Sequence, residues 1–252
     1  MPLAAQINTI LYGGSPYAGF DVSQLPFDLD GWFDDTAIFD IFIDQIHPEL
    51  IVEVGSWKGR SSHHLIKRAM QHTDASIICV DTWLGSSEHW VNPGWRPMLG
   101  IKHGRPTLHE QFIANVIHAG LADRVVPLPL PSRQASIVLE RLRQGRAGFA
   151  QLIFIDGAHD EASVREDIAC YWPLLSPGGV MIGDDYSENN WPGVVNAVAG
   201  FQAERADQIH DAGRVNGRWF ARKRRDAATL PPAEITGAHF GYSLAALASN
   251  PL

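Results

Sequence analysis

Residues 50–62 read LIVEVGSWKGRSS, and this stretch decides the fold class. Its first five residues are apolar apart from Glu53, which is typical of a strand buried on both faces of a sheet. Gly55 and Gly59 then predict a tight turn from the strand into a helix. The turn lacks the third glycine of a dinucleotide fingerprint and the Gly-Lys-Ser/Thr of a phosphate-binding loop, which counts against a nicotinamide oxidoreductase.

The same alternation of strand and helix continues along the chain. Buried-strand patterns recur four times, at 76–81, 124–130, 151–156 and 178–185. Two shorter strands, 208–211 and 218–222, predict a hairpin whose turn is flanked by Gly213 and Gly217. Continuous apolar strands separated by helices predict an α/β fold, with a doubly wound, mostly parallel seven-stranded sheet and a C-terminal antiparallel hairpin.

Helix-start and helix-end signals fall between these strands. Ser61 is expected to cap the helix after the first strand, and Asp160 the helix after the fourth. Thr107 and Glu110 have the spacing of a capping box. Gly120 has the position of the glycine that follows a helix C-terminus.

The sequence predicts three parts along the chain. Residues 1–33, rich in Gly, Pro and Asp, predict an irregular arm or cap, and residues 34–222 predict the catalytic domain. Within that domain, residues 84–106 predict a long loop insertion, and such insertions in compact domains are usually functional. Residues 223–252 are weakly patterned and are expected to form a C-terminal tail.

Composition excludes several classes of protein. The 252 residues include 20 basic and 28 acidic side chains, a formal net charge of −8. This balance argues against a nucleic-acid partner and against attraction to an anionic membrane surface. No apolar run has the length of a membrane span, and the first residues lack the pattern of a signal peptide. Two cysteines, Cys79 and Cys170, do not make a disulfide framework, so a cytoplasmic location is expected.

Acidic residues gather where the predicted strands end. They are Glu53, Asp81, Asp156, Asp184 and Asp185. Because ligands of open α/β sheets bind outside the carboxyl ends of the strands, these carboxylates are expected at one binding edge. So much like charge requires a cation or a ligand with many donors. Asp81 is placed to accept bonds from ribose hydroxyls, or else to cap a turn, and Trp83 offers a flat surface for a base.

These segments resemble a known family. VEVGSWKGRSS (52–62), VDTW (80–83), FIDGAH (154–159) and MIGDDY (181–186) follow one another as in the class I S-adenosylmethionine-dependent methyltransferases. Within that superfamily the chain is most similar to the small metal-dependent O-methyltransferases, including the group that acts on sugars of natural products. The resemblance covers residues 34–222 and implies the Rossmann-like methyltransferase fold.

The resemblance implies a binding site for S-adenosylmethionine. The methionine part of this cofactor would be wrapped by Glu53, Gly55, Ser56, Trp57, Gly59 and Ser61. Asp81 would bind the ribose with Trp83 beside it, and Ser132, just after the third strand, would lie near the adenine. Asp156 would border the same site.

The resemblance also implies a divalent metal ion, Mg²⁺, on Asp156, Asp184 and Asp185. An independent argument supports it, because three carboxylates that converge without a cation repel one another and hard oxygen ligands suit Mg²⁺. The alternative is that Asp184 and Asp185 cap the following loop and helix. The Asp-Asp pair resembles the sugar-directed group more than relatives with aromatic substrates, many of which have Asp-Asn.

The expected reaction is methylation of a hydroxyl on a small molecule. His159 and Asp156 are the candidate catalytic residues. His159 is the candidate general base, because its ordinary pKa of about 6.5 suits that role, and the alternative is a structural histidine. Tryptophans near the site favour a sugar or glycosylated acceptor, with a catechol or phenol as the alternative, and four are expected there: Trp83, Trp90, Trp95 and Trp191. A non-catalytic nucleoside-binding or scaffold protein of the same fold also stays open, as does a homo-oligomer.

Overall fold

The computed structural model describes residues 1–34, 36–145 and 147–225. The strands within them are β1 (Leu50–Val54), β2 (Ser76–Val80), β3 (Val125–Leu128), β4 (Ala150–Ile155), β5 (Leu175–Gly183), β6 (Ile209–Val215) and β7 (Arg218–Lys223). They form one sheet in the order β3-β2-β1-β4-β5-β7-β6. The pairs among β1 to β5 are parallel, and β7 runs antiparallel to both β5 and β6. The predicted fold class is therefore confirmed.

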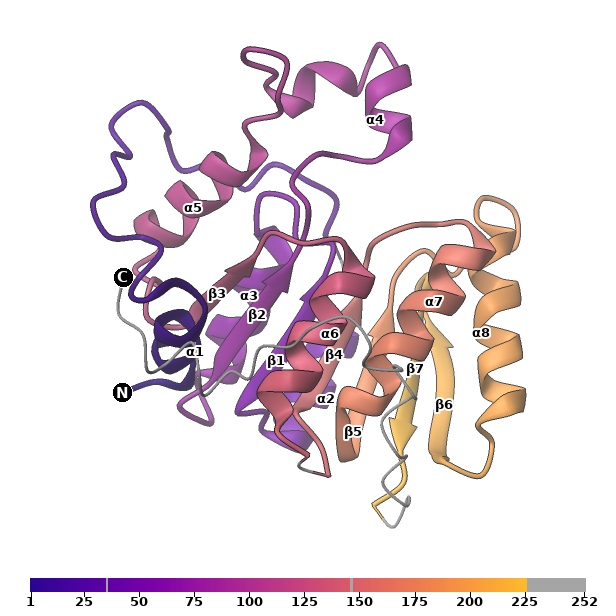
Figure 1. Ribbon diagram of the computed structural model, residues 1–252. Helices are drawn as coiled ribbons and strands as arrows, with labels where there is room; N and C mark the ends of the chain where they lie inside the picture. The colour runs from indigo at the N-terminus through magenta and orange to yellow at the C-terminus, as the bar shows by residue number, and fades with distance from the viewer. Residues whose placement is uncertain (35, 146, 226–252) are drawn as a thin grey trace, which may run out of the picture.

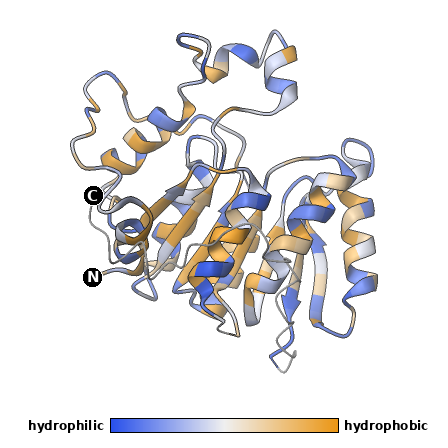
Figure 2. Cartoon of the chain, viewed as in Figure 1, coloured by the Kyte–Doolittle hydropathy of each residue, from blue (hydrophilic) through white to orange (hydrophobic). Residues whose placement is uncertain are grey.

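Burial and turn chemistry explain these strands. Every residue of β1, β2 and β3 is buried, and Figure 2 shows the central strands in the colour of hydrophobic residues. β3 lies at one edge of the sheet, where a strand tolerates the missing N–H donor of Pro127. At the other edge, the hairpin turns through Asn216 and Gly217, whose φ angles of 50° and 79° suit a two-residue Asn-Gly turn. Gly213, expected beside the turn, lies within β6 instead.

Helices cover both faces of the sheet (Figure 1). They are α1 (Leu3–Tyr12), α2 (Ala37–Ile46), α3 (Arg60–Ala69), α4 (Ser87–Val91), α5 (Leu108–His118), α6 (Ser132–Arg143), α7 (Glu161–Tyr171) and α8 (Pro192–Glu204), with the 3-10 helices η1 (Arg96–Leu99) and η2 (Trp172–Leu174). One apolar core contains residues of α1, α6, α7 and α8, and a second contains residues of α2, α3 and α5. Alternate strand residues face the two cores, with Val52 and Val54 in the first and Ile51 in the second.

Two segments that were expected to be irregular contain helices. α1 lies within residues 1–33, and its Ala4 and Ile7 are buried in the first core, so this segment packs on the sheet. Residues 13–33, called the arm below, contain neither helix nor strand. Residues 84–106, called the cover below, contain α4 and η1 and stand above the sheet edge in Figure 1.

The structure corrects two of the expected helix starts. α3 begins directly after Gly59, whose backbone is left-handed (φ 88°), so Ser61 lies inside the first turn and does not cap it. At α5, Thr107 makes no side-chain capping bond, so the capping box with Glu110 is wrong. Asp160 caps α7 as expected, because its side chain accepts the N–H of a residue in the first turn.

The ends of the chain bear on two further expectations. β7 ends at Lys223, and residues 226–252 of the expected C-terminal tail lie outside the described residues. Among the helices of the described ranges, none is both long enough and apolar enough to cross a membrane.

Candidate functional site

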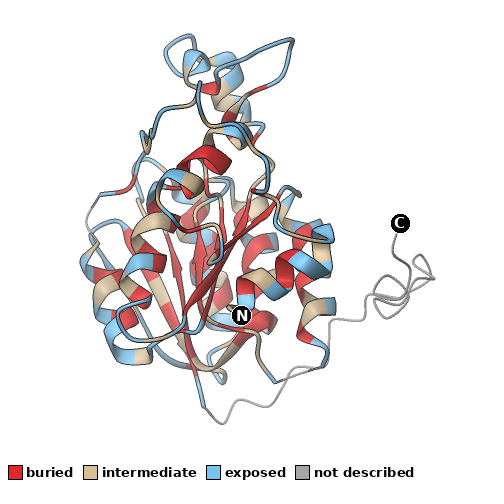
Figure 3. Cartoon of the chain, turned by 90° about the vertical axis from the view of Figure 1, so that its left-hand side faces the viewer, coloured by how far each residue is buried: buried red, intermediate tan, exposed pale blue. Residues whose placement is uncertain are grey.

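A cavity of about 790 Å³ lies over the carboxyl ends of the parallel strands, where the sequence predicted a site. Its walls come from the loops after β1, β2, β3, β4 and β5, from the arm and from the cover. The volume is within the range of small-molecule and cofactor sites. Figure 3 shows the buried strands below and the largely exposed cover above.

Gly55 brings the loops after β1 and β4 together. Its backbone is left-handed (φ 88°), and a Cβ atom at this position would overlap the carbonyl oxygen of Asp156. Only glycine combines this conformation with so close an approach. The turn after β1, residues 55–59, is therefore held against the strand end that carries Asp156, and both Gly55 and Asp156 line the cavity.

The Asp81 carboxylate holds the turn in place from β2. Its Oδ2 accepts the backbone N–H groups of Ser56 (3.0 Å) and Trp57 (2.8 Å), and its Oδ1 accepts that of Trp83 (2.6 Å). Burial raises the pKa of Asp81, although these donors favour its charged form. Because Asp81 also lines the cavity, it both fixes the turn and faces the space for a ligand.

Glu53 lies beneath the turn rather than in the cavity. It is fully buried, accepts a hydrogen bond from the Ser62 hydroxyl and does not line the cavity. Burial raises its pKa, which disfavours the charged form. The expectation of a direct cofactor contact is therefore corrected, since Glu53 ties α3 to β1. Gly59 is also outside the lining, which near the turn includes Gly55, Ser56, Trp57 and Ser61.

Trp83 is not available to stack on a ligand. Only 1% of its surface is exposed, and its ring packs against His109 and Phe112. Its Nε1 donates to the carbonyl of Trp57 (2.7 Å). The expectation that Trp83 faces a base is therefore wrong, and its indole supports the turn from the core side.

The carboxylates after β4 and β5 lie close enough to affect one another. Burial, together with the charges of Asp184 and Asp185, raises the pKa of Asp156 well above its ordinary value. Burial also raises the pKa of Asp184, although the guanidinium of Arg218 lies 3.1 Å away and opposes this. Arg218, at the start of β7, was missed by the sequence analysis because its partner lies 34 residues away on a neighbouring strand.

The three predicted metal ligands are not arranged as a metal-binding group. In the part of the chain that the structure describes, no group of three or more Asp, Glu, His or Cys side chains is placed to hold a metal ion. Asp184 faces Arg218, and Asp185 contacts His159. Asp156 and Asp185 line the cavity, whereas Asp184 does not.

His159 lies between the carboxylates and the cover. Its Nε2 is 2.9 Å from Oδ2 of Asp185, its ring stacks on Trp191 at 4.0 Å between centroids, and its Nδ1 is 4.0 Å from Oε1 of Glu88. The hydrogen bond to Asp185 raises the pKa of His159. When the neutral ring donates from Nε2 to Asp185, Nδ1 is left as a proton acceptor beside the cavity.

Asp167, which the sequence analysis missed, lies with Ser132 at the wall formed after β3. Ser132 donates its hydroxyl to Asp167, and its carbonyl accepts from Oη of Tyr171 (2.9 Å). Burial raises the pKa of Asp167 to about 6, and both Ser132 and Asp167 line the cavity. A signal was present, because Asp167 interrupts the apolar face of α7 that Val164 and Ile168 form.

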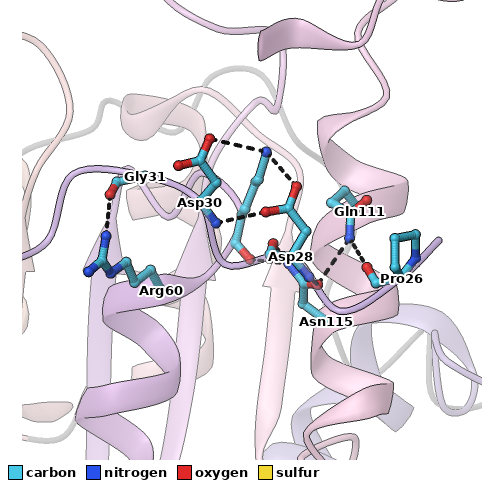
Figure 4. A network of polar contacts seen from close by, with 8 residues as sticks. Pro26, Asp28, Asp30, Gly31, Arg60, Gln111 and Asn115 are labelled. Carbon is cyan, nitrogen blue, oxygen red and sulfur yellow. Dashed lines mark hydrogen bonds and ion pairs between the residues drawn. The ribbon is translucent and has the colours of Figure 1, made fainter.

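A network of polar contacts fastens the arm beside the cavity (Figure 4). The Asn115 side chain on α5 accepts the N–H of Asp28 (2.9 Å) and donates to the carbonyls of Asp28 (2.6 Å) and Lys58 (2.8 Å). Lys58 also forms an ion pair with the Asp28 carboxylate (2.7 Å), and Arg60 donates to the carbonyl of Gly31 (2.6 Å). The arm is therefore joined both to α5 and to the turn after β1.

Comparison with known protein families identifies the chain. The family described as "Methyltransferase domain" matches residues 52–186, which run from β1 to just past the Asp184–Asp185 pair. The chain belongs to this methyltransferase family. The match spans just over half of the chain and includes the turn after β1, Asp81 and Asp156. No curated protein matches the chain.

Solved O-methyltransferase structures share the methyltransferase fold at low sequence identity. TomG from Streptomyces achromogenes, involved in tomaymycin synthesis and solved with SAM, has a TM-score of 0.53 and 15% identity over 74% of this chain and 78% of its own. The calicheamicin methyltransferase CalS11 has a TM-score of 0.54 and 17% identity over 73% and 77%. An O-methyltransferase from Bacillus cereus, solved with SAH, has a TM-score of 0.51 and 17% identity over 88% and 93%.

Proposed function

We propose that this methyltransferase transfers the methyl group of S-adenosylmethionine to a hydroxyl of a small-molecule acceptor. The observation that carries the proposal is a single cavity lined by the Gly55 turn, by Asp81 and by the candidate base His159. The similar folds of TomG, solved with SAM, and of the Bacillus cereus O-methyltransferase, solved with SAH, support this cofactor and this reaction.

The cofactor would lie along the cavity wall from β1 to β3. The turn after β1 would hold the methionine part, Asp81 the ribose hydroxyls, and Ser132 with Asp167 the region of the adenine. The turn, Asp81 and Ser132 follow the neighbouring strands β1, β2 and β3, and Gly55, Asp81, Ser132 and Asp167 line the cavity. Because Asp81 already accepts backbone N–H groups of the turn, the ribose would share this carboxylate with them.

The side chains of the chain would align the acceptor and take up its proton. Methyl transfer is an in-line displacement at a carbon that the sulfonium already activates, so alignment contributes most, roughly 7–11 kcal/mol. His159 would accept the hydroxyl proton at Nδ1, while Asp185 at Nε2 orients the ring and stabilises its positive charge. Trp191 holds the face of the ring by stacking.

Mg²⁺ on Asp156, Asp184 and Asp185 is a separate part of the proposal. Carboxylate oxygens suit this ion, and burial together with the charges of Asp184 and Asp185 raises the pKa of Asp156, a like-charge repulsion that a cation would relieve. The arrangement of the described residues does not fit the ion, however, because Asp184 is paired with Arg218 and Asp185 with His159. The steps above therefore use only the side chains of the protein.

A sugar or glycosylated natural product is the proposed acceptor. Of the four tryptophans that the sequence placed near the site, Trp95 and Trp191 line the cavity and Trp83 and Trp90 do not. Indole faces pack well on the C–H surfaces of sugars. CalS11, described in a second structure as a TDP-rhamnose 3'-O-methyltransferase, has a similar fold, with a TM-score of 0.51 and 18% identity.

Isothermal titration calorimetry tests the cofactor. The protein should bind S-adenosylmethionine with a dissociation constant on the order of micromolar and should not bind NAD. Absence of any binding of S-adenosylmethionine would overturn the proposed function, and binding of NAD alone would favour an oxidoreductase.

Turnover measurements test the base and the metal separately. His159→Ala should lower turnover by about 10²–10⁴-fold without weakening cofactor binding. His103→Ala is the control, because His103 is exposed on the cover and does not line the cavity. Turnover that EDTA abolishes and added Mg²⁺ restores would support the metal, although the described residues do not fit it. Turnover that EDTA leaves unchanged would remove the metal from the proposal.

A further inference from the structure

Four aromatic rings meet over one side of the cavity. The rings of Trp57 and His89 are stacked, with centroids 4.7 Å apart and planes at 25°. Trp32 lies 5.9 Å from Trp57, 5.7 Å from His89 and 6.0 Å from Trp95, and His89 lies 5.7 Å from Trp95. These four residues, called the aromatic cluster below, form a connected set of ring contacts.

The aromatic cluster joins three separate segments of the chain. Trp32 belongs to the arm, Trp57 to the turn after β1, and His89 and Trp95 to the cover. All four line the cavity. Trp32 is 56% exposed and Trp95 is 36% exposed, so much apolar ring surface is left uncovered. Exposed apolar surface grouped inside a cavity is typical of a ligand contact rather than of core packing.

The aromatic cluster also contains two N–H donors without partners. Nδ1 of His89 accepts the backbone N–H of Ser86 (3.2 Å) and lies 2.7 Å from the Ser86 hydroxyl, so we assign the proton of the neutral ring to Nε2. Burial lowers the pKa of His89, which favours this neutral form. Nε2 of His89 and Nε1 of Trp57 are both buried and have no hydrogen-bond partner. A buried donor without a partner is costly, so a ligand oxygen at this place would be stabilising.

The aromatic cluster lies within reach of the candidate base. Glu88, next to His89 on α4, contacts His159, with Oε1 4.0 Å from Nδ1. His159 in turn contacts Asp185 at the sheet edge. A molecule with a hydroxyl at His159 would therefore extend from the carboxylates toward the rings of the cover and the arm.

We propose that the aromatic cluster is the acceptor subsite, and that it binds a ring with an apolar C–H face and oxygen atoms on its rim, the chemistry of a pyranose. The exposed indole faces of Trp32 and Trp95 stack on the C–H face. The N–H donors of Trp57 and His89 serve the rim oxygens. The inference rests on the proposed methyltransferase function, since it concerns the acceptor side of the same cavity.

Ligand-observed saturation-transfer NMR tests the subsite. The full-length protein is mixed with methyl hexopyranosides and methyl deoxyhexopyranosides, or with catechol, each with and without S-adenosylhomocysteine. Pyranosides should receive saturation mainly at the C–H protons of one face, and Trp95→Ala should weaken their binding by about tenfold. Trp90→Ala is the matched control and should change pyranoside binding much less, because Trp90 is 39% exposed on the same cover, does not line the cavity and donates only to the carbonyl of Leu84 within the cover.

A second pair of variants tests the donor role of His89. His89→Leu should weaken pyranoside binding, and His89→Gln, which restores a side-chain N–H donor, should recover most of it. Binding of catechol but of no pyranoside, or equal effects of Trp95→Ala and Trp90→Ala, would overturn the proposal. Calorimetry with S-adenosylhomocysteine distinguishes failure of the acceptor subsite from failure of the proposed methyltransferase function. If the wild type binds S-adenosylhomocysteine but the variants bind pyranosides as well as the wild type does, the subsite alone is rejected. If the wild type does not bind S-adenosylhomocysteine, the proposed function is rejected.

Discussion

The sheet edge and the cover surround the same cavity but are held in different ways. At the sheet edge, Gly55 fits against Asp156, Asp81 accepts three backbone N–H groups, and the buried Arg218 pairs with the partly buried Asp184. The cover is joined to the arm through the partly exposed rings of the aromatic cluster. Buried charges and tight backbone contacts are costly to break, whereas exposed contacts cost little. Stability and cofactor binding should therefore depend on the sheet edge, and acceptor recognition on the cover.

Of the variants that compare the sheet edge with the cover, Arg218→Met should lower the free energy of unfolding most. It leaves the Asp184 carboxylate, which is only 19% exposed, without its cation, and this should lower the free energy of unfolding by about 3–5 kcal/mol. Urea denaturation measures the change. Arg214→Met is the control, because its ion pair with Glu188 is exposed (66% and 71%), and it should cost at most about 1 kcal/mol. Equal losses in both variants would refute the internal role of Arg218.

Gly55→Ala and Gly104→Ala compare two glycines with the same left-handed backbone, one packed at the sheet edge and one exposed on the cover. The added Cβ meets both a positive φ and the Asp156 carbonyl, so the free energy of unfolding should fall by about 2–4 kcal/mol. Gly104→Ala on the cover, with φ 81° and no atom within 4 Å, should cost only about 1–2 kcal/mol. Thermal or urea denaturation measures both losses. Similar losses of unfolding free energy in Gly55→Ala and Gly104→Ala would show that the contact with Asp156 is unimportant.

Asp167 should make the cofactor side of the cavity sensitive to pH. Burial raises its pKa from 3.8 to about 6, so the folded protein holds this proton more tightly than the unfolded chain. Stability from this group is therefore greatest below pH 4 and falls as the pH rises to 6, by about 2–3 kcal/mol.

Asp167→Asn should remove that pH dependence. The difference in unfolding free energy between the wild type and the variant, measured by urea denaturation from pH 4 to pH 7, should shift in favour of the variant as pH rises. A difference that stays constant over this range would show that Asp167 titrates in the folded protein near the ordinary pKa of an aspartate.

Asn115→Ala should have the smallest effect on stability and should act on the arm. It removes the hydrogen bonds that tie the arm to α5 and to Lys58, so the free energy of unfolding should fall by about 1–2 kcal/mol. The arm should also become more susceptible to limited proteolysis. Gln111→Ala is the milder comparison, because it removes one exposed bond to Pro26 and one bond to Asn115 but leaves the bonds of Asn115 to Asp28 and Lys58 in place. Unchanged cleavage of the arm in Asn115→Ala would show that other contacts hold it.

The sheet could be predicted because each strand carries its own signal. Apolar runs such as LIVEV and QLIFI are buried almost completely in the structure, and their separation by helices dictates a parallel sheet. Helix starts were less predictable. Whether Ser61 or Thr107 caps a helix depends on local backbone angles, and at α3 the left-handed Gly59 took the place of Ser61.

The site was predictable in position but only partly in its members. Successive residues of a strand point to opposite faces, so acids near strand ends do not all reach the cavity. Asp81 and Asp156 line it, whereas Glu53 lies beneath the turn and Asp184 is turned toward Arg218.

The sequence by itself determined the fold class, the binding edge and the acids that gather there, because apolar runs, glycines and strand-end residues are local features. Only the tertiary structure decided which side chains meet across that edge. Arg218 reaches Asp184 because β7 lies beside β5 in the sheet, although α8 and β6 separate these strands in the chain. Asp167 on α7 reaches Ser132 on α6 because the two helices lie side by side. The aromatic cluster likewise forms because folding brings the arm, the turn after β1 and the cover over one cavity, and no local pattern encodes contacts between such distant segments.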